Sequence, residues 1–426
     1  MQRISAEKTD TLVANLLAEI NSTGLARYDP TDVMSSPAFS AMAERLGRPG
    51  YLALRLAEHW LPMTIRRVFR VDKTIVPTTY WHILETYRHR FTAGHAQAAE
   101  CLHSLALNCI ENGVWADETL CWPHPFSFHG AAWRSAAFQP TKERPDNCAH
   151  NTARNGLALL NAAKTIAAPE LCDAGIAAAR AMIKHNNWFW YDNGDRCAVS
   201  YYPSSQDEVI NTGADVALLL ASAYQASNYQ LFADRARGLL SMVIAEQNAD
   251  GSWQYATKAH ENRLGPAAGP DNHHHAMTFR VLAKVLDQQP YLFADVHQAQ
   301  NALIMGIDYY LKELSESSGY CRFAPRKNRE ADIAGYCEGA LALGCAQITL
   351  AKFDNAAAKR VERRCNAILR YTIDRFVRSN PTRVISRFRF GTAYDIGSIR
   401  WGSGLLLEAL TQQKAMRKKE VVADDR

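Results

Sequence analysis

Asp271-Asn-His-His-His275 ends a turn-rich loop and is followed by an apolar run with helical spacing. Four other segments have this form, beginning at Asp146, Asp207, Asp332 and Asp395, so that the five are 61, 64, 61 and 63 residues apart. Asp is a favourable N-cap because its carboxylate accepts hydrogen bonds from the free N–H groups of a first helical turn. A period of about 60 residues, with each unit closed by a capped helix, is typical of a repeat architecture.

A second set of helices is expected between these segments, because apolar residues recur there at steps of three and four. Their ranges are Ala93–Asn112, Pro169–His185, Asn228–Gln247, His297–Leu314 and Asn355–Arg378. The capped helices are richer in small and apolar residues, as in Gly335–Cys345, which suits burial on both sides. Each unit is therefore predicted to be a helical hairpin with an outer helix and a buried inner helix.

A sixth inner helix is expected at Thr78–Arg90, after N-terminal helices near Ser5–Ile20 and Gly50–Arg70. Six such hairpins close into an all-α (α/α)6 toroid, with an open α-solenoid as the alternative. We expect a single domain over 1–412, with N-terminal helices at 1–75 and the repeats at 76–412. The basic run from Lys414 to Lys419 predicts a disordered tail over 413–426.

Composition limits the class of protein. The 426 residues are 47% apolar, enough for a substantial core, and the net charge of +5 forms no concentrated basic face, so no nucleic-acid partner is expected. The N-terminus lacks an apolar signal core, and no run of about 18 apolar residues predicts a membrane-spanning helix. Ten cysteines without paired spacing are typical of a reduced cytoplasmic protein.

The long loops before the inner helices concentrate aromatic and cationic side chains on one face. The aromatic residues are Trp115, Trp122, Phe126, Phe128, Trp133, Trp188, Phe189, Trp190, Tyr191, Tyr201, Tyr202, Trp253, Tyr255, Tyr320 and Phe323. The cations are Arg144, Arg196, Arg263, Arg322, Arg326, Arg329, Arg389 and Arg400. A funnel with aromatic walls and helix N-termini at its floor binds ring faces and favours anionic groups.

The three histidines at positions 273–275 cannot all face one way, because neighbouring helical residues differ by about 100°. We expect His273 or His275 to reach the axis, where imidazole suits acid–base work near neutral pH. The alternative is a capped helix with two solvent-facing histidines and one in the core. Capping alone explains most of the Asp residues, but a carboxylate at a pocket floor can also act as an acid or base. Asp271 and Asp332 are preferred, with Glu338 beside them and Asp207 next.

Two motifs resemble those of toroid cyclases. Cys337 in Gly-Tyr-Cys-Glu-Gly resembles the zinc-binding segment of lanthionine-synthetase cyclases, and Cys148, His150 and either His273 or His275 would complete the site. The Cys-His-Gly segment of that family is absent, so we expect neither a metal nor another cofactor. Gln247-Asn-Ala-Asp-Gly-Ser-Trp253 resembles the repeat of terpenoid cyclases, in which Gly supplies a positive φ. Carbohydrate-processing toroids use the same turn, and the acidic motif of the cyclases is missing.

Several motifs in a fixed order extend the resemblance over residues 115–350. They are Cys121-Trp-Pro-His-Pro-Phe126, Asn151–Leu160, Tyr201-Tyr-Pro203, Asn211–Leu220, Gln247–Trp253 and Asp271–Ala276. In this order they resemble a family of α/α-toroid proteins, similar to prenyltransferases and terpenoid cyclases in fold, that are encoded in bacterial polysaccharide gene clusters. The resemblance implies a polysaccharide-related activity.

The sequence therefore predicts an enzyme that acts on an acidic saccharide or glycoconjugate. For a lyase or C5-epimerase, His273 or His275 would be the base, Tyr202 the proton donor, and Arg263 or Arg400 the carboxylate clamp. For a hydrolase, Asp207 and Asp332 would form the carboxylate pair. The remaining residues expected to bind substrate are Trp253, Tyr255, Trp190, His150 and Glu338. An isoprenoid- or peptide-modifying cyclase and a non-catalytic binding toroid are the alternatives.

Overall fold

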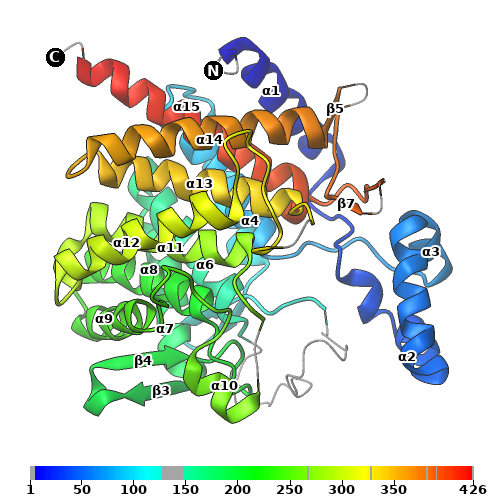
Figure 1. Cartoon of the computed structure of the whole chain (residues 1–426), viewed down its shortest axis with the longest axis horizontal. Coiled ribbons are helices and arrows are strands. Elements are labelled where there is room, and N and C mark those ends of the chain that lie inside the picture. The colour runs from blue at the N-terminus through cyan, green and yellow to red at the C-terminus, as the bar shows by residue number, and fades with distance from the viewer. Residues whose placement is uncertain are drawn as a thin grey trace.

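The computed structural model describes residues 5–126, 147–265, 268–326, 329–379, 382–389 and 391–424. In this part of the chain, six inner helices form a closed ring (Figure 1). They are α4 (Thr78–Thr92), α6 (Ala149–Ile166), α8 (Ile210–Ser227), α11 (Asn272–Gln288), α13 (Ile333–Leu350) and α15 (Gly404–Asp424). Each packs against the next, and α15 packs against α4. This last contact closes the ring, which confirms the all-α toroid and excludes the open solenoid.

An outer helix packs against each inner helix. These are α5 (Ala98–Glu111), α7 (Pro169–His185), α9 (Gln230–Ala245), α12 (Val296–Tyr309, extended by a π-turn at Tyr310–Leu314), α14 (Asn355–Phe376) and α1 (Ala6–Thr23). The first helix of the chain thus pairs with the last. Of the described helices, α13 alone is long and apolar enough to cross a membrane, and 89% of it is buried between its neighbours.

The first N–H of four inner helices donates to a carbonyl of the following unit's loop. Ala149 bonds to Tyr201, Ile210 to Tyr255, Asn272 to Phe323 and Ile333 to Ser386, at 2.9–3.1 Å. These bonds satisfy donors that a helix start otherwise leaves free. They also fix the aromatic loops at one end of the ring, where the inner helices begin.

The prediction that an Asp side chain caps each inner helix is confirmed at one position only. Asp271 caps α11, its side chain accepting a hydrogen bond from the backbone of His274. Asp332 is the N-cap residue of α13 but makes no capping bond, and Asp207 precedes the N-cap of α8. Asp395 does not start a helix, because α15 begins only at Gly404, after a π-helical turn at Ile399–Ser403. Asp146 lies outside the described residues.

Short hairpins and helical turns occupy the loops, which the sequence pattern did not predict. Four antiparallel hairpins pair β1 (Val114–Ala116) with β2 (Thr119–Cys121), β3 (Trp188–Tyr191) with β4 (Arg196–Val199), β5 (Val377–Ser379) with β6 (Thr382–Val384), and β7 (Arg387–Arg389) with β8 (Thr392–Tyr394). The short helices are Asp32–Ser35, α10 (Lys258–Leu264), Asp192–Gly194 and Pro290–Leu292.

Two N-terminal helices, α2 (Pro37–Trp60) and α3 (Pro62–Val68), stand apart from the ring in Figure 1. The buried guanidinium of Arg66 joins them to the ring: its nitrogens lie 2.8 Å from Asp32, 3.1 Å from Glu58 and 3.0 Å from the hydroxyl of Tyr394. The helices are therefore held near the end of the ring that carries the loops.

The C-terminal helix α15 extends into the range 413–426, where the sequence predicts a disordered tail. α15 continues to Asp424, and the side chains of Gln413, Ala415 and Met416 are buried. Lys414 bonds to Asp10 of α1 at 2.7 Å. Lys414 and Lys418 thus lie at the outer edge of a helix whose other face packs into the ring.

Gly251 is expected to be intolerant of alanine. It has φ 88°, as the Asp-Gly turn predicts, and a Cβ there would collide with the backbone carbonyl of Met305. Gly251→Ala should cost roughly 1–3 kcal/mol or more of unfolding free energy. Gly194→Ala is the control, because Gly194 has φ 104° but open space around it. If denaturant titrations show the same loss of unfolding free energy in both variants, the close contact of Gly251 with Met305 does not contribute to the cost.

Candidate active site

A buried network of charged side chains occupies the axis of the ring. Each inner helix contributes one member: His82, Arg154, Asp215, Arg280, Glu338 and Glu408 in chain order. Glu338 Oε1 accepts hydrogen bonds from Arg280 at 2.9 Å and from Arg154 at 3.4 Å. Glu408 accepts from Arg280 at 2.5 Å and lies 2.7 Å from His82 Nδ1. Side chains of all six helices can meet only at the axis, so the network forms a charged floor across the ring.

The floor remains ionised despite its burial. Burial alone would raise the pKa of Glu338, but Arg280 and Arg154 hold it well below its usual value. Trp81 covers the same layer: its indole N–H donates to Glu408 at 3.1 Å, and both guanidinium groups lie 5.6 Å from its ring. Buried charges of this kind are tolerated only when they are paired.

Two half-buried histidines lie closer to the helix starts than this floor. His150 begins α6, with its Nδ1 3.2 Å from Asp215 Oδ2. His273 begins α11, and its buried Nδ1 has no hydrogen-bond partner. Burial is the main cause that lowers the pKa of both rings, that of His273 to about 3, and the charge of Arg154 lowers both further. Both histidines are therefore neutral at pH 7 and electrostatically coupled to the same arginine. A neutral imidazole has the free lone pair that a general base requires.

A second group surrounds His273. Its ring packs on Trp401 at 5.2 Å and on His274 at 5.1 Å, and Tyr255 packs edge-on against His274 at 4.8 Å. Asp271 Oδ2 lies 2.6 Å from His274 Nδ1. Burial would raise the pKa of Asp271, but His274 brings it below its usual value. Asp271 thus stays ionised, and it positions His274 rather than acting as an acid.

Arg400 links this end of the ring to the N-terminal segment. Its Nε lies 2.9 Å from Asp29 Oδ2, and its Nη1 lies 3.4 Å from His124 Nε2. Burial and then the charge of Arg400 lower the pKa of His124 to about 3. Since Asp29 already neutralises Arg400, this arginine is a weaker carboxylate clamp than the sequence suggested.

Three arginines lie around Asp332 at the start of α13. Burial raises the pKa of Asp332, and Arg387, Arg329 and Arg389 oppose that rise. Burial followed by the charges of Arg329 and Arg387 lowers the pKa of Arg389, so these guanidinium groups are close enough to repel one another. A Cβ on Gly335 would lie 2.9 Å from the side chain of Asn272, so the first turns of α13 and α11 are in contact. These arginines therefore lie near the helix start that carries His273.

His275 and Trp253 belong to the core and not to the site. His275 is 1% exposed, and its Nε2 bonds to the carbonyl of Gly306 at 2.8 Å. Trp253 packs against it at 5.1 Å and donates its indole N–H to the carbonyl of Val243 at 2.8 Å. The pattern could not tell which of the three histidines faces inward, because that choice depends on the rotation of α11 in the ring.

Three other predicted residues have partners elsewhere. Tyr202 is buried against the half-buried Tyr201, with 4.9 Å between their rings, so Tyr201 is the better proton donor of the two. Arg263, on α10, bonds to Glu208 at 2.6 Å and is not a free clamp. Trp190 is exposed on β3, with Arg235 of α9 4.2 Å above its ring.

Asp207 lies against a different histidine, and the cysteines of the possible zinc site are buried. Asp207 is half-buried and 4.0 Å from His260 Nδ1, and burial raises its pKa. Among the described residues no three His, Cys, Asp or Glu side chains converge as metal ligands would. Cys148 and Cys337 are both buried, and burial raises the pKa of Cys337 well above its usual value.

The sequence reasoning missed most of the axial network. It singled out Glu338 but not its partners in other inner helices, which are Arg154, Asp215, Arg280 and Glu408. A signal was available, because each is a charged residue embedded in an apolar helix, as in Leu405-Leu-Leu-Glu-Ala-Leu410. A buried charge needs a partner, and the repeat could have supplied it.

The neutral histidines predict a loss of stability in acid. Burial is the main cause that lowers the pKa of His124 and His273 to about 3 and that of His275 to about 4, below the unfolded value of 6.5. The unfolded chain binds more protons between these values, so the stabilisation present above pH 6.5 is lost as pH falls. Each histidine contributes up to about 1.4 kcal/mol per pH unit.

His275→Gln should remove about one histidine's share of this slope. Unfolding free energies of the wild type and the variant, measured from pH 7 to pH 5, test this expectation. An unchanged slope in the variant would contradict it.

Comparison with solved structures shows that the fold is an α/α toroid. No protein-family model and no curated protein matches the sequence. The structure is similar to that of an α-mannanase of glycoside hydrolase family 76 from Bacteroides thetaiotaomicron, with a TM-score of 0.58, 10% identity, and coverage of 92% of this chain and 99% of the other. A sugar epimerase from a ruminal bacterium has a TM-score of 0.59 and 12% identity, with coverage of 80% of this chain and 87% of the other. A polysaccharide lyase has a TM-score of 0.54 and 11% identity, with coverage of 80% of this chain and 91% of the other. At these identities the likeness shows the fold, an α/α toroid.

Proposed function

We propose that the protein is a glycan-processing enzyme that transfers a proton at a carbon of an acidic saccharide, as a lyase or an epimerase does. The observation that carries the proposal is the pair His150 and His273, neutral and half-buried above a fixed charged floor. The resemblance to proteins of bacterial polysaccharide gene clusters supports a saccharide substrate, as do the activities named for the structural neighbours.

The proposed reaction begins with proton abstraction. His273 takes the proton α to a uronate carboxylate with its free lone pair, and the charge moves into the carboxylate as an enolate. Arg329 and Arg389, beside Asp332, stabilise that enolate because cations placed in advance cost no reorganisation during the reaction.

The second proton transfer completes either reaction. Tyr201 returns a proton to the carbon from the opposite face in an epimerase, whereas in a lyase it protonates the departing glycosidic oxygen as the double bond forms. Asp215 holds the His150 ring at 3.2 Å, so this neutral imidazole is positioned to bind and orient the sugar. Burial raises the pKa of Tyr201 well above its usual value, so its hydroxyl retains a proton to donate.

Hydrolysis is the second candidate, favoured by one observation. Burial raises the pKa of both Asp332 and Asp207, and a protonated carboxyl is the general acid of a glycosidase. In this reaction the histidines and arginines would bind substrate only.

A thermal-shift screen tests whether the site takes acidic saccharides. Uronate oligosaccharides are compared with neutral oligosaccharides of equal length, because ligand at about 100 times its Kd adds about 2.7 kcal/mol of stability. We expect uronates alone to raise the Tm, and Arg389→Gln to abolish the shift. Stabilisation by neutral sugars alone would overturn the acidic-substrate proposal, and stabilisation by prenyl diphosphates alone would favour the cyclase alternative.

A further inference from the structure

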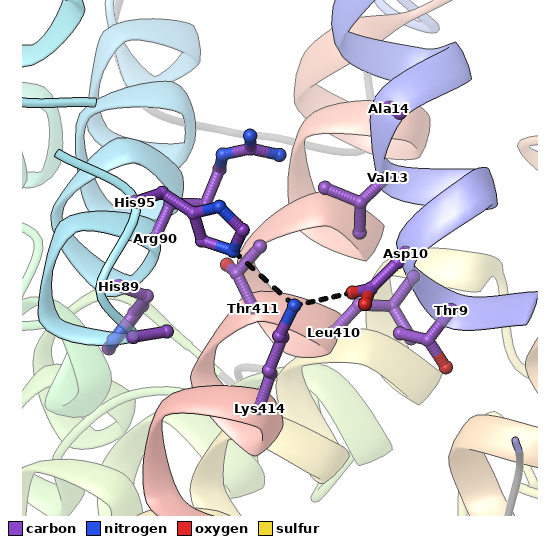
Figure 2. A pocket seen from close by; sticks show the side chains of 11 residues that line it. Thr9, Asp10, Val13, Ala14, His89, Arg90, His95, Leu410, Thr411 and Lys414 are labelled. Carbon is purple, nitrogen blue, oxygen red and sulfur yellow. Dashed lines mark hydrogen bonds and ion pairs between the residues drawn. The ribbon is translucent and has the colours of Figure 1, made fainter. Parts of the chain in front are cut away.

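A cavity of about 210 Å³ lies between α1, α4 and α15, at the end of the ring opposite the histidine pair (Figure 2). Its polar lining comprises Thr9, Asp10, His89, Arg90, His95, Thr411 and Lys414, and the apolar lining comprises Val13, Ala14, Ala93 and Leu410. None of these residues belongs to the candidate active site. The cavity is smaller than those that hold drug-sized ligands, roughly 300–1,000 Å³, and so suits a small ligand.

Arg90 is the unexplained group in this cavity. It is half-buried near the end of α4, its Nε is buried without a hydrogen-bond partner, and no described residue forms an ion pair with it. Desolvating a guanidinium donor without a partner costs free energy. Figure 2 shows the guanidinium beyond the His95 ring, on the side away from Lys414.

The charges around Arg90 make the cavity positive. Lys414 Nζ lies 2.7 Å from Asp10 and 3.3 Å from His95 Nε2, and Asp10 is the sole carboxylate in the lining. Arg90 is therefore left without a balancing charge. The pKa of His95 is lowered mainly by burial and then by the positive charges of Arg90 and Lys414, which agrees with a positive cavity.

The negative end of α4 does not cancel this field, because its carbonyls are occupied. The carbonyl of His89 accepts from Ala93, that of Arg90 accepts from His95 at 3.0 Å, and that of Ala93 accepts from Lys418 Nζ at 2.9 Å. The last of these places a further cation at the same helix end.

We propose that this cavity binds a phosphate-type oxyanion, either free phosphate or the phosphate group of a small sugar phosphate. Arg90 presents a planar fork of donors that matches two phosphate oxygens, and Lys414, on the other side of the His95 ring, adds to the positive field of the cavity. Asp10 holds Lys414 in place while the site is empty of anion and weakens binding by its own charge. The proposal is independent of the reaction at the other end of the ring.

Calorimetry and histidine NMR of the full chain test the proposal with inorganic phosphate, a hexose phosphate and chloride at constant ionic strength. We expect phosphate to bind and to raise the pKa of His95, because an added anion favours the charged imidazole. Tighter binding of the hexose phosphate would identify the sugar phosphate as the natural source, and equal binding would identify free phosphate. A chloride response equal to that of phosphate, or an unchanged His95, would overturn the proposal.

Three variants separate the site from non-specific charge. Arg90→Gln should weaken phosphate binding roughly tenfold or more, since a charge-assisted bidentate contact is lost. Asp10→Asn should strengthen it. Arg237→Gln is the matched control, because Arg237 is an exposed arginine paired with Asp234 on α9. Equal affinities for Arg90→Gln, Arg237→Gln and the wild type would overturn the assignment, and circular dichroism of each variant verifies the fold.

Discussion

Replacing His273 with glutamine is expected to lower saccharide turnover by roughly 10²–10⁴ while the protein stays folded. The glutamine side chain keeps two polar groups of similar reach, but it lacks the basic imidazole nitrogen that abstracts a proton. Stability should change by no more than about 1 kcal/mol, because the His273 Nδ1 makes no hydrogen bond that the variant would lose. Turnover and unfolding free energy of the same preparations provide the measurement.

A surface histidine supplies the control for this prediction. His103 is exposed and pairs with Glu170 at 2.7 Å, so His103→Gln should leave turnover unchanged. A second variant, Tyr201→Phe, should also lose activity, because the proton donor is then missing. Full turnover in His273→Gln with a normal fold would remove His273 from the mechanism and favour the hydrolytic pair Asp207 and Asp332.

Glu408→Ala is expected to destabilise the protein by about 3–5 kcal/mol. The carboxylate holds Arg280 at 2.5 Å, His82 at 2.7 Å and the Trp81 indole at 3.1 Å, all of them buried. Its removal leaves a guanidinium in the core with fewer acceptors, and an unpaired buried charge is costly. Denaturant-induced unfolding measures the loss.

Two further variants show whether charge pairing at the axis is the cause. Glu408→Gln keeps hydrogen-bonding capacity and should cost less than the alanine variant. Glu118→Ala removes the partner of Arg180 from an exposed pair and should cost no more than about 1 kcal/mol. A loss of less than 1 kcal/mol in Glu408→Ala would mean that water or the neighbouring Glu338 replaces the missing acceptor.

The repeat positions were predictable because each inner helix needs a strong start and an apolar face. α8, α11 and α13 begin within three residues of Asp207, Asp271 and Asp332. The physical cause assigned to those positions was only partly right. The first N–H of each helix bonds to a loop carbonyl about one unit further along, a contact that depends on ring closure.

The part of the site that comes from one sequence motif could be predicted. The part that several helices assemble could not. Asp271 and His273 came from a single segment, and the structure places them together with His274 and Tyr255. Arg154 and Glu408 lie in different apolar helices, and only the closed ring shows that they face one axis. The sequence also does not show the rotation of α11 about its own axis, which places His275 in the core.

Deuterium uptake by the substrate tests the central claim most directly. A panel of uronate oligosaccharides is incubated with wild-type protein in D₂O, and the sugars are analysed by mass spectrometry and NMR. The account predicts deuterium at C5 after epimerisation, or an unsaturated uronate after elimination, and neither product with His273→Gln. New reducing ends that carry no deuterium at C5 and no double bond would contradict it, because hydrolysis leaves every carbon-bound hydrogen in place.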